Sequence, residues 1–391
     1  MKRIGILLNS EPYSGGMFQY NQSVIDALDH LPKNEFKTYI IYTKKEWGNY
    51  LSDFDFETRY IHTDVISELL SKVGKYLFLN TWRNVSSRIH PLYKCIRKLN
   101  LDIWIFPSQD EYSYQVKCNS ICAIHDLMHR YEKFPEINGK GEFRNREALF
   151  SNIAKFSNII LVDSLCGKEQ VLECYANTEE AKIHVLPYIA PPYIFEQSAH
   201  DFDTKFELPS KYLYYPAQFW EHKNHLNLFL ALSEVKKKHA DIKLVLVGSK
   251  KNGYDKAFSV IKDLELVNNI IYLGYVEDKY IPTLYKRARA LVMPTFFGPT
   301  NIPPLEAMAL GCPMAVSGIY GMKEQSKDAA LYFDPNSVTE ISHSLMRLWE
   351  DDLLCQELSE KGYAIYQNWN QVQFNEKFKA IVEQALTYSP A

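Results

Sequence analysis

Apolar runs alternate with segments of helical spacing along most of the chain. The run "IGILLN" at 4–9 is continuous, as in a buried strand, and the apolar residues of 14–31 then recur at helical spacing. Further strands are expected where such runs recur, at 36–43, 101–108, 120–126, 158–164, 182–188, 211–218, 242–249, 270–276, 290–295 and 313–318. This alternation predicts an α/β protein with a mostly parallel sheet, covered by helices on both faces.

The alternation occurs twice, on either side of a stretch with three prolines between Pro187 and Pro192. Such a stretch is typical of a linker, and 391 residues exceed what one ordinary core holds. We therefore expect an N-terminal domain at 1–192 and a C-terminal domain at 205–370. Open α/β sheets bind ligands at the carboxyl ends of their strands, so a site is expected in a cleft between the domains.

Composition narrows the kind of partner and the compartment. The net charge of −3 gives the chain no overall attraction to nucleic acid or to anionic lipid. The apolar run at the start is too short for a signal peptide, and no segment approaches the roughly 20 apolar residues of a membrane span. The seven cysteines are scattered without zinc-site spacing, which favours reduced thiols in a cytoplasmic protein and no metal site.

One stretch, 71–100, is strongly basic. It holds seven Lys and Arg residues and no acid, with aromatic and leucine residues interleaved between 76 and 82. A basic, aromatic-rich stretch can lie on an anionic membrane face or touch an anionic acceptor. A solvated helix face is the alternative.

The segment 291–316 carries a candidate ligand site. An apolar run ends there in a loop, and the first position of the next helix is expected at Pro303 or Pro304. The residue before it, Ile302 or Pro303, has no side chain that can cap the helix. The amides of Leu305 and its neighbour would then remain available to an anion such as phosphate.

Glu306 lies in the first turn of this expected helix, and its carboxylate allows two interpretations. It can accept hydrogen bonds from both hydroxyls of a vicinal diol, such as a nucleotide ribose. Alternatively it only complements the helix dipole, a contribution of about 0.3–1 kcal/mol. The residues alone leave both open.

Lys223 is a second candidate. The run 211–218 is followed by a polar turn, and Lys223 stands just before helical spacing that begins near Asn224. A lysine at the carboxyl end of a strand is well placed to meet phosphate. A surface lysine without a ligand is the alternative.

Two loops of the N-terminal half are further candidates. Gly15 and Gly16 follow the first strand and would let the backbone approach a ligand, although the third glycine and the acid of a dinucleotide fingerprint are missing. His125 and Asp126 end another strand, where a histidine can donate to a sugar hydroxyl or to developing negative charge. A packed or surface histidine is the alternative.

Together these motifs resemble the retaining glycosyltransferases of family four, which have the GT-B fold of two Rossmann-like domains facing across a cleft. The resemblance spans nearly the whole chain and rests on "IHDL", "AQFWEHKNH", "YLGYV", "GPTNIPPLEAMALGCP" and "NWNQVQF". It implies that the C-terminal helix, 371–391, packs back on the N-terminal domain.

The resemblance also implies the site residues. Lys223 would hold the diphosphate together with Gln218, and Glu306 would hold the ribose. His125 would contact the transferred sugar, so that Lys223 and His125 are the expected catalytic residues. The remaining contacts would come from loop amides at Thr300, Asn301 and Ile302, from a base pocket at Tyr275, Val276 and Leu284, and, for sugar and acceptor, from Gly15, Gly16 and Asp126.

Two positions depart from the family pattern. Gly298 stands where the first glutamate of the family's E-x7-E motif is expected, and Gln218 stands at the arginine of the diphosphate clamp. One charge-assisted hydrogen bond contributes about 1.5–3 kcal/mol, so a weaker or differently oriented donor is expected.

The expected function is transfer of a hexose from a nucleoside diphosphate sugar, UDP-glucose or a related UDP-hexose, with retention of configuration. The acceptor would be a saccharide or lipid-linked saccharide in polysaccharide biosynthesis, and no metal or other cofactor is required. The alternatives are a catalytically weak pseudoenzyme or assembly subunit that binds a nucleotide sugar, and an epimerase acting on a UDP-sugar.

Overall fold

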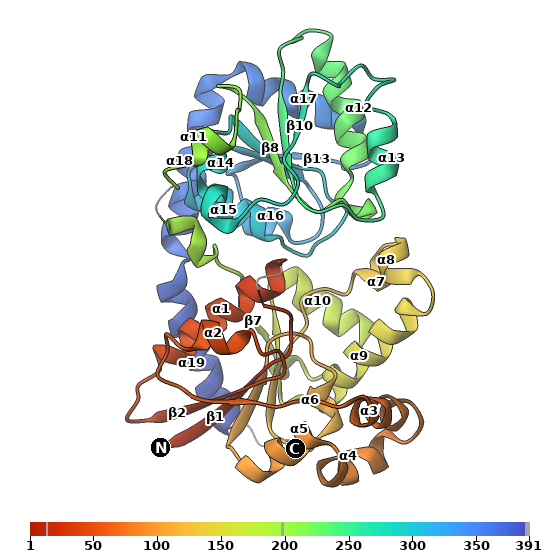
Figure 1. Cartoon of the computed structure of the whole chain (residues 1–391), viewed down its shortest axis with the longest axis vertical. Helices are drawn as coiled ribbons and strands as arrows, with labels where there is room; N and C mark the ends of the chain where they lie inside the picture. Colours follow the sequence, from red (N-terminus) through yellow and green to blue (C-terminus); the bar gives the residue numbers. More distant parts are fainter. Residues whose placement is uncertain (13–14, 197–198, 388–391) are drawn as a thin grey trace. The chain divides into compact units, whose positions relative to one another are not determined.

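A computed structural model describes residues 1–12, 15–196 and 199–387, and the chain divides into two compact units (Figure 1). The first unit comprises Met1–Leu127, Phe143–Pro187 and Gln371–Ala391, and the second comprises Met128–Glu142 and Tyr188–Asn370. The segment 371–391 therefore belongs with the first unit. The segment 128–142, in contrast, belongs with the second unit, although the sequence places it within the predicted N-terminal domain.

The described residues of the first unit form a seven-stranded sheet in the order β3-β2-β1-β4-β5-β6-β7. Every neighbouring pair is parallel. The strands are β1 (Lys2–Leu8), β2 (Phe36–Tyr42), β3 (Glu57–Tyr60), β4 (Ile103–Phe106), β5 (Ser120–Ala123), β6 (Ile159–Val162) and β7 (Ile183–Val185). Strands β2 and β3 are added on one side of β1, and β4 to β7 are added on its other side. Because the connections between parallel strands are right-handed, the two directions place helices on both faces of the sheet.

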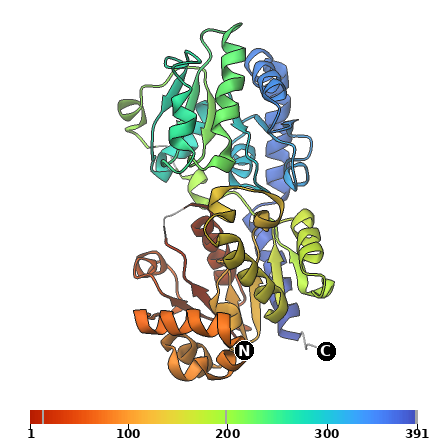
Figure 2. The ribbon, with the colours of Figure 1, turned by 90° about the vertical axis from the view of Figure 1, so that its right-hand side faces the viewer.

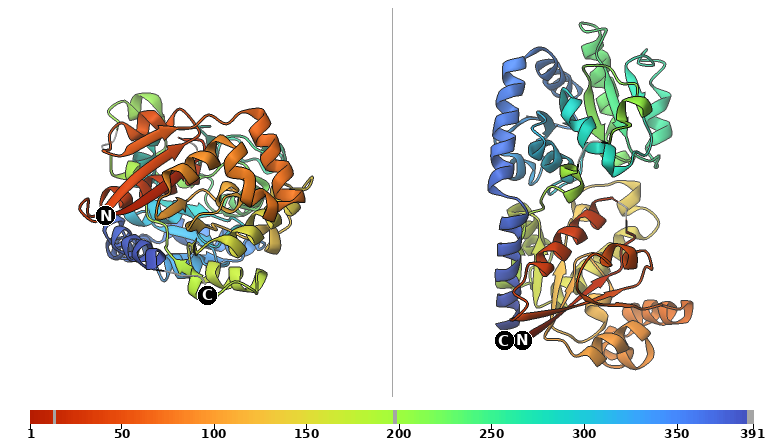
Figure 3. Two further views of the ribbon diagram at one scale, coloured as in Figure 1. Left: turned by 90° about the horizontal axis from the view of Figure 1, so that it is seen from below. Right: turned by 60° about the vertical axis from the view of Figure 1, so that its left-hand side comes forward.

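The described helices of the first unit connect these strands, apart from one at the end of the chain. They are α1 (Gly15–Asp29), α2 (Trp47–Leu51), α3 (Val65–Leu77), α4 (Leu79–Ile89), α5 (Pro91–Leu99), α6 (Tyr112–Gln115), α9 (Glu142–Phe156), α10 (Leu165–Cys174), η1 (Glu180–Lys182) and α19 (Gln371–Thr387). The last of them, α19, lies beside α1 (Figure 3). Gln371 Nε2 donates to the Ser23 carbonyl at 3.2 Å, and Asn375 Nδ2 donates to Asp26 Oδ2 at 3.3 Å.

The second unit contains a six-stranded sheet among its described residues, in the order β10-β9-β8-β11-β12-β13, again with parallel neighbours. The strands are β8 (Leu213–Pro216), β9 (Leu244–Val247), β10 (Ile270–Tyr272), β11 (Ala290–Met293), β12 (Met314–Ser317) and β13 (Ala330–Phe333). This is the strand order of a Rossmann fold, in which the sequence direction reverses between β8 and β11.

The helical segments described in the second unit include several single turns. They are α7 (Met128–Tyr131), α8 (Pro135–Asn138), η2 (Pro192–Phe195), α11 (Phe202–Lys205), η3 (Glu221–Lys223), α12 (His225–Lys236), α13 (Tyr254–Ser259), η4 (Asp278–Tyr280), α14 (Ile281–Arg287), α15 (Ile302–Ala309), α16 (Met322–Ser326), α17 (Val338–Glu350) and α18 (Asp352–Asn368). Among the described residues of the chain, no helix combines the length and the apolarity needed to cross a bilayer.

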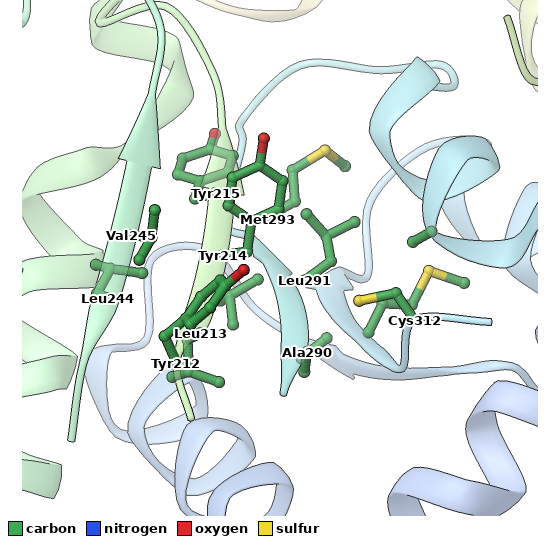
Figure 4. Packing of buried hydrophobic residues seen from close by; sticks show 14 of the residues in the cluster. Tyr212, Leu213, Tyr214, Tyr215, Leu244, Val245, Ala290, Leu291, Met293 and Cys312 are labelled. Atoms are coloured by element: carbon green, nitrogen blue, oxygen red, sulfur yellow. The ribbon is translucent and has the colours of Figure 1, made fainter. Parts of the chain in front are cut away.

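The core of the second unit is rich in buried tyrosines around β8 (Figure 4). The hydroxyl of a buried tyrosine usually has a hydrogen-bond partner. Tyr212 donates to the Leu284 carbonyl at 2.8 Å, and Tyr215 donates to the Lys223 carbonyl at 2.8 Å. The core therefore fixes the backbone of the loop that follows β8.

Each apolar run that predicted a strand contains one in the structure. Sequence analysis missed β3 and β13, which are the outermost strands of their sheets. In β3 three of the four side chains are exposed, so the segment shows no apolar run. An edge strand has only one neighbouring strand, and a weaker pattern is enough to hold it.

Candidate functional site

The second sheet has its topological switch point between β8 and β11, the place where open α/β sheets bind ligands. The loop after β8 carries Lys223, and the loop after β11 leads into α15. Lys223 Nζ lies 3.4 Å from Asn301 Oδ1, directly before the first turn of α15. The structure thus brings together the lysine and the helix tip that the sequence predicted separately.

The Lys223 loop is held in place by backbone and buried side-chain bonds. The chain turns at Asn224, which has a left-handed backbone with φ of 60°. Its Nδ2 donates to the carbonyls of Pro294 at 2.9 Å and Pro335 at 2.8 Å. The amide of Phe296 donates to the His222 carbonyl at 2.8 Å, so the two loops of the switch point are tied to each other.

The start of α15 differs from the prediction by one or two residues. The helix begins at Ile302, with Asn301 before it, so the prolines occupy the second and third positions. The expected absence of a side-chain cap is confirmed, although Asn301 is a residue type that caps well. Its Nδ2 donates instead to the Phe297 carbonyl at 2.9 Å.

This change reduces the number of amides that an anion could meet. Prolines 303 and 304 have no N–H, and the amide of Glu306 lies within the helix, where it bonds to the carbonyl four residues back. The amide of Asn301 donates to Gln325 Oε1 at 3.2 Å, and Gln325 Nε2 donates to the Asn301 carbonyl at 2.7 Å. The dipole of α15 and the ammonium of Lys223 are then the main positive features of this site.

The carboxylate of Glu306 is buried and already accepts two hydrogen bonds. The Tyr285 hydroxyl donates to Oε2 at 2.6 Å, and the Tyr193 hydroxyl donates to Oε1. Burial raises the pKa of Glu306, and the two hydroxyl donors oppose that rise. A carboxylate has about four acceptor positions, and the two tyrosine hydroxyls occupy two of them. Contact of Glu306 with a ribose stays a prediction.

The two departures from the family pattern have different surroundings. A Cβ at Gly298 would lie 2.8 Å from Cβ of Tyr320, so the space that a glutamate would need there is filled by this tyrosine. Gln218 is exposed, and its Oε1 accepts from Trp220 Nε1 at 3.0 Å. Neither position contributes a positive or negative charge to the switch point.

The expected base-pocket residues differ in exposure. Tyr275 is 71% exposed and is available to a ligand, whereas Val276 is buried and Leu284 is completely buried in the core. Leu284 therefore serves packing in this structure, and a base contact by Tyr275 or Val276 stays a prediction. Thr300 and Ile302 lie half-buried beside Asn301.

The segment 128–142 contacts the Lys223 loop through residues that sequence analysis missed. Glu136 Oε1 accepts from the His222 amide at 3.2 Å and from the His222 ring, and Glu136 Oε2 accepts from Asn252 Nδ2 at 2.9 Å. The His222 ring also stacks on Phe297, with centroids 3.7 Å apart. The residue next to Lys223 is thereby fixed from two sides.

This contact predicts a specific pH dependence. Burial alone would raise the pKa of Glu136, but hydrogen bonds from His222 and Asn252 outweigh it and lower the pKa from 4.5 to about 2. A lowered pKa means that the stabilisation is complete above about pH 4.5 and is lost as the pH falls towards 2. Thermal unfolding followed from pH 6 to pH 2.5 should show a steeper loss for the natural protein than for Glu136→Gln. Parallel curves would contradict this assignment.

In the first unit, His125 lies at the carboxyl end of β5, as predicted, but with a different hydrogen-bonding role. Its Nε2 donates to the Pro107 carbonyl at 2.8 Å, and its amide donates to Gln109 Oε1 at 2.9 Å. Burial lowers the pKa of His125 to about 4, against the raising influence of the Pro107 carbonyl and Asp126. In a neutral ring whose Nε2 carries the proton, Nδ1 only accepts hydrogen bonds. The Nε2 proton is thus already used by the Pro107 carbonyl, and a contact of His125 with the transferred sugar stays a prediction.

The other candidates of the first unit lie at the same edge of its sheet. Asp126 is paired with Arg146 of α9, and Gly15 opens α1 after β1. A Cβ at Gly15 would meet nothing within 4 Å, but φ of 65° favours glycine there. Gly16 follows within α1, whereas Ser14 lies outside the described residues. Their contact with sugar or acceptor stays a prediction.

Comparison with known proteins assigns the second unit. Residues 196–365 match the family model of the group 1 glycosyl transferases. Residues 196–365 thus form a domain of this family. The match covers most of the second unit, including both loops of the switch point, and leaves the first unit outside.

Two bacterial proteins are among the curated relatives of this chain. O-antigen chain mannosyltransferase B of Escherichia coli is 39% identical over 95 residues, which are 24% of this chain and 25% of that protein. O-antigen chain mannosyltransferase RfbU of Salmonella typhimurium is 29% identical over 219 residues, which are 56% of this chain and 57% of that protein. The matches thus span at most a little over half the length of these two relatives.

Solved structures show that the fold is GT-B. Sucrose-phosphate synthase from Thermosynechococcus elongatus matches with a TM-score of 0.74 and 15% identity, covering 100% of both chains. The Anabaena protein HepE, solved in complex with UDP-glucose, matches with a TM-score of 0.74 and 14% identity, covering 98% of this chain and 100% of that one. At such identities the likeness establishes the architecture alone.

Proposed function

We propose that the protein is a glycosyltransferase that moves a hexose, with retention of configuration, from a nucleoside diphosphate sugar to a saccharide or lipid-linked saccharide in polysaccharide biosynthesis. The proposal includes a cytoplasmic location. It is carried by one observation: Lys223 Nζ lies 3.4 Å from Asn301 Oδ1, at the start of α15 and at the switch point of the second sheet. A diphosphate at this place would meet a cation and the positive end of a helix dipole.

The proposed reaction requires stabilisation of its leaving group, the nucleoside diphosphate. The bond between the anomeric carbon and the β-phosphate oxygen breaks, and its electron pair stays on the nucleoside diphosphate. On the face from which the phosphate departs, the acceptor oxygen forms the new bond to that carbon and passes its hydroxyl proton to the departing β-phosphate oxygen. Lys223 and the dipole of α15 would stabilise the growing negative charge, which accelerates the reaction because this charge is larger in the transition state than in the bound donor.

The identity of the donor is the finer part of the proposal. A UDP-hexose, UDP-glucose included, is the donor that the family resemblance favours, whereas the relatives named as mannosyltransferases favour mannose as the sugar. A melting-point screen against UDP-, GDP-, ADP- and dTDP-sugars, each carrying glucose or mannose, separates these donors. Ligand at 100 times its dissociation constant adds about 2.7 kcal/mol of stability. A panel that leaves the melting point unchanged throughout would contradict the proposal.

We also propose that transfer needs no metal ion, because Lys223 and the α15 dipole would take over the neutralisation of the diphosphate. Turnover with the donor found in the screen should be unchanged after dialysis against EDTA and in EDTA-containing buffer. Loss of turnover on chelation, restored by adding Mg²⁺ or Mn²⁺, would contradict this part of the proposal and leave the donor site itself in place.

A second candidate function is a nucleotide-sugar-binding protein with little or no turnover. It is favoured by Gln218, which brings no charge, and by Gly298, where Tyr320 occupies the space of a glutamate. A donor that raises the melting point but is neither transferred nor hydrolysed with any acceptor would support this candidate. Measurable hydrolysis of the donor without acceptor would favour the enzyme.

A further inference from the structure

Helix α3 of the first unit has its apolar side turned outward. Val65 is 84% exposed, Ile66 71% and Leu69 60%. The exposed apolar residues are Val65, Ile66, Leu69, Leu70, Val73 and Tyr76 of α3, together with Phe78 directly after the helix. A helix on the surface of a globular protein normally shows the opposite arrangement, with this face against the core.

The inward side of α3 is made of small and polar residues. Ser67 and Ser71 are buried, and so is Gly74 one turn further on. Ser71 Oγ donates to Gln115 Oε1 at 2.7 Å and lies 3.0 Å from the Tyr93 hydroxyl.

This packing fixes the rotation of the helix about its axis. A Cβ at Gly74 would lie 2.4 Å from the ring of Trp82, so no larger residue fits on the inward side at this point. Trp82 Nε1 in turn donates to Gln115 Oε1 at 2.8 Å. The N-terminus is held by Asp64, which accepts from the Ser67 amide at 2.8 Å. The outward face is therefore a built feature of the fold, and contiguous apolar patches of this kind mark interaction sites.

The charges near this face indicate which partner covers it. Helices α3, α4 and α5 pack side by side (Figure 2), and 71–100 contains no acidic residue. The described basic residues of this stretch that are exposed are Lys72, Arg88, Lys94, Arg97 and Lys98. A hollow of about 530 Å³ at the amino ends of β4, β5 and β6, lined in part by α4 and α5, is also basic, with cations from Arg83, Arg97, Lys117, Lys155 and Lys182. The described residues that line it include no carboxylate.

We propose that this three-helix surface docks on the anionic headgroups of a lipid bilayer, with the apolar face of α3 lying in the interface. Apolar residues on one face and cations at its flanks are the features by which interfacial helices bind anionic lipid. A second copy of the chain is a poorer occupant, because a symmetric contact over the three helices would bring together the two sets of cations at 71–100, which Asp64 and Glu68 at the start of α3 offset only in part. The sequence predicted the contact at 71–100, and the structure places its apolar part at Val65–Leu77 and Phe78.

Sedimentation with vesicles tests this proposal and needs no turnover, so its outcome is independent of the transferase assignment. The natural chain should bind vesicles of phosphatidylglycerol mixed with phosphatidylcholine at least tenfold more tightly than phosphatidylcholine alone. The triple variant Ile66→Ser, Leu69→Ser, Val73→Ser should bind the mixed vesicles at least tenfold more weakly with an unchanged melting point, because all three side chains are exposed. The matched control is Val267→Ser with Leu353→Ser, two exposed apolar residues of the second unit, and it should bind like the natural chain.

Three results would overturn the proposal. The first is equal binding of the natural chain to both kinds of vesicle, and the second is full binding by the triple variant. The third is a dimer in solution that the triple variant abolishes while vesicle binding is absent, which would assign α3 to a second copy of the chain. If the triple variant fails to fold, the single variant Leu69→Asp replaces it with the same expectations.

Discussion

Replacing Lys223 with alanine should lower turnover about 100- to 1,000-fold, the range found when one charge-stabilising donor is removed from an active site. The expected loss lies at the upper part of this range because the site has little to replace the ammonium. Prolines at the second and third positions of α15 remove two amides, and Gln218 brings no charge. The measurement is the steady-state rate with the donor identified in the screen.

The fold should survive this change, because the loop is held by bonds that do not use the ammonium. The Tyr215 hydroxyl bonds to the Lys223 carbonyl, and the Asn224 side chain bonds to two carbonyls. Lys243→Ala is the matched control. Lys243 directly precedes β9, at the amino ends of the strands of the same sheet, and donates to the Asn268 carbonyl. Equal rates for Lys223→Ala and Lys243→Ala would contradict the role assigned to Lys223.

Glu306→Ala should lower the free energy of unfolding by about 2–3 kcal/mol, since each buried hydroxyl left without its acceptor costs about 1–3 kcal/mol. The two hydroxyls are those of Tyr285, which is completely buried, and Tyr193. The same variant should weaken binding of the nucleoside diphosphate if Glu306 also meets the ribose. Denaturant unfolding gives the first quantity, and calorimetric titration gives the second.

Glu306→Gln separates the two roles. An amide can accept from one tyrosine hydroxyl and donate to the oxygen of the other, so most of the stability should remain. A glutamine offers a diol only one acceptor, so the dissociation constant should rise about tenfold if the ribose contact exists. A dissociation constant that stays the same in both variants would make Glu306 a purely structural residue.

The fold could be predicted from sequence because its strands are buried on both faces. Such strands appear as continuous apolar runs, as "LVLV" does at β9. The order of elements then implied the two parallel sheets. The edge strand β3 escaped because "ETRY" is mostly exposed and has no such run.

The site could be predicted only where a local pattern carries the chemistry. Lys223 was found because it stands between a strand and a helix, and the tip of α15 was found through its prolines. The partners of Glu306 could not be found in this way, since Tyr193 is 113 residues away in sequence and resembles any core tyrosine. The same holds for Glu136, which reaches His222 across 86 residues.

The inverted helix α3 shows a further limit of pattern reading. Its apolar residues recur at helical spacing, which indicates an amphipathic helix. Only the structure shows that Ser67, Ser71 and Gly74 face inward and that the apolar side is exposed. Periodicity identifies an amphipathic helix but does not tell which of its faces meets the protein.

The central claim is that the two phosphates of the donor rest between Lys223 and the start of α15. The most direct test is calorimetric titration of the natural chain and of Lys223→Ala with the preferred nucleoside diphosphate and with its parent nucleoside, which lacks phosphate. The account predicts that the variant binds the diphosphate at least tenfold more weakly and binds the nucleoside as the natural chain does. Equal affinity of both proteins for the diphosphate, or an equal loss for both ligands, would contradict it.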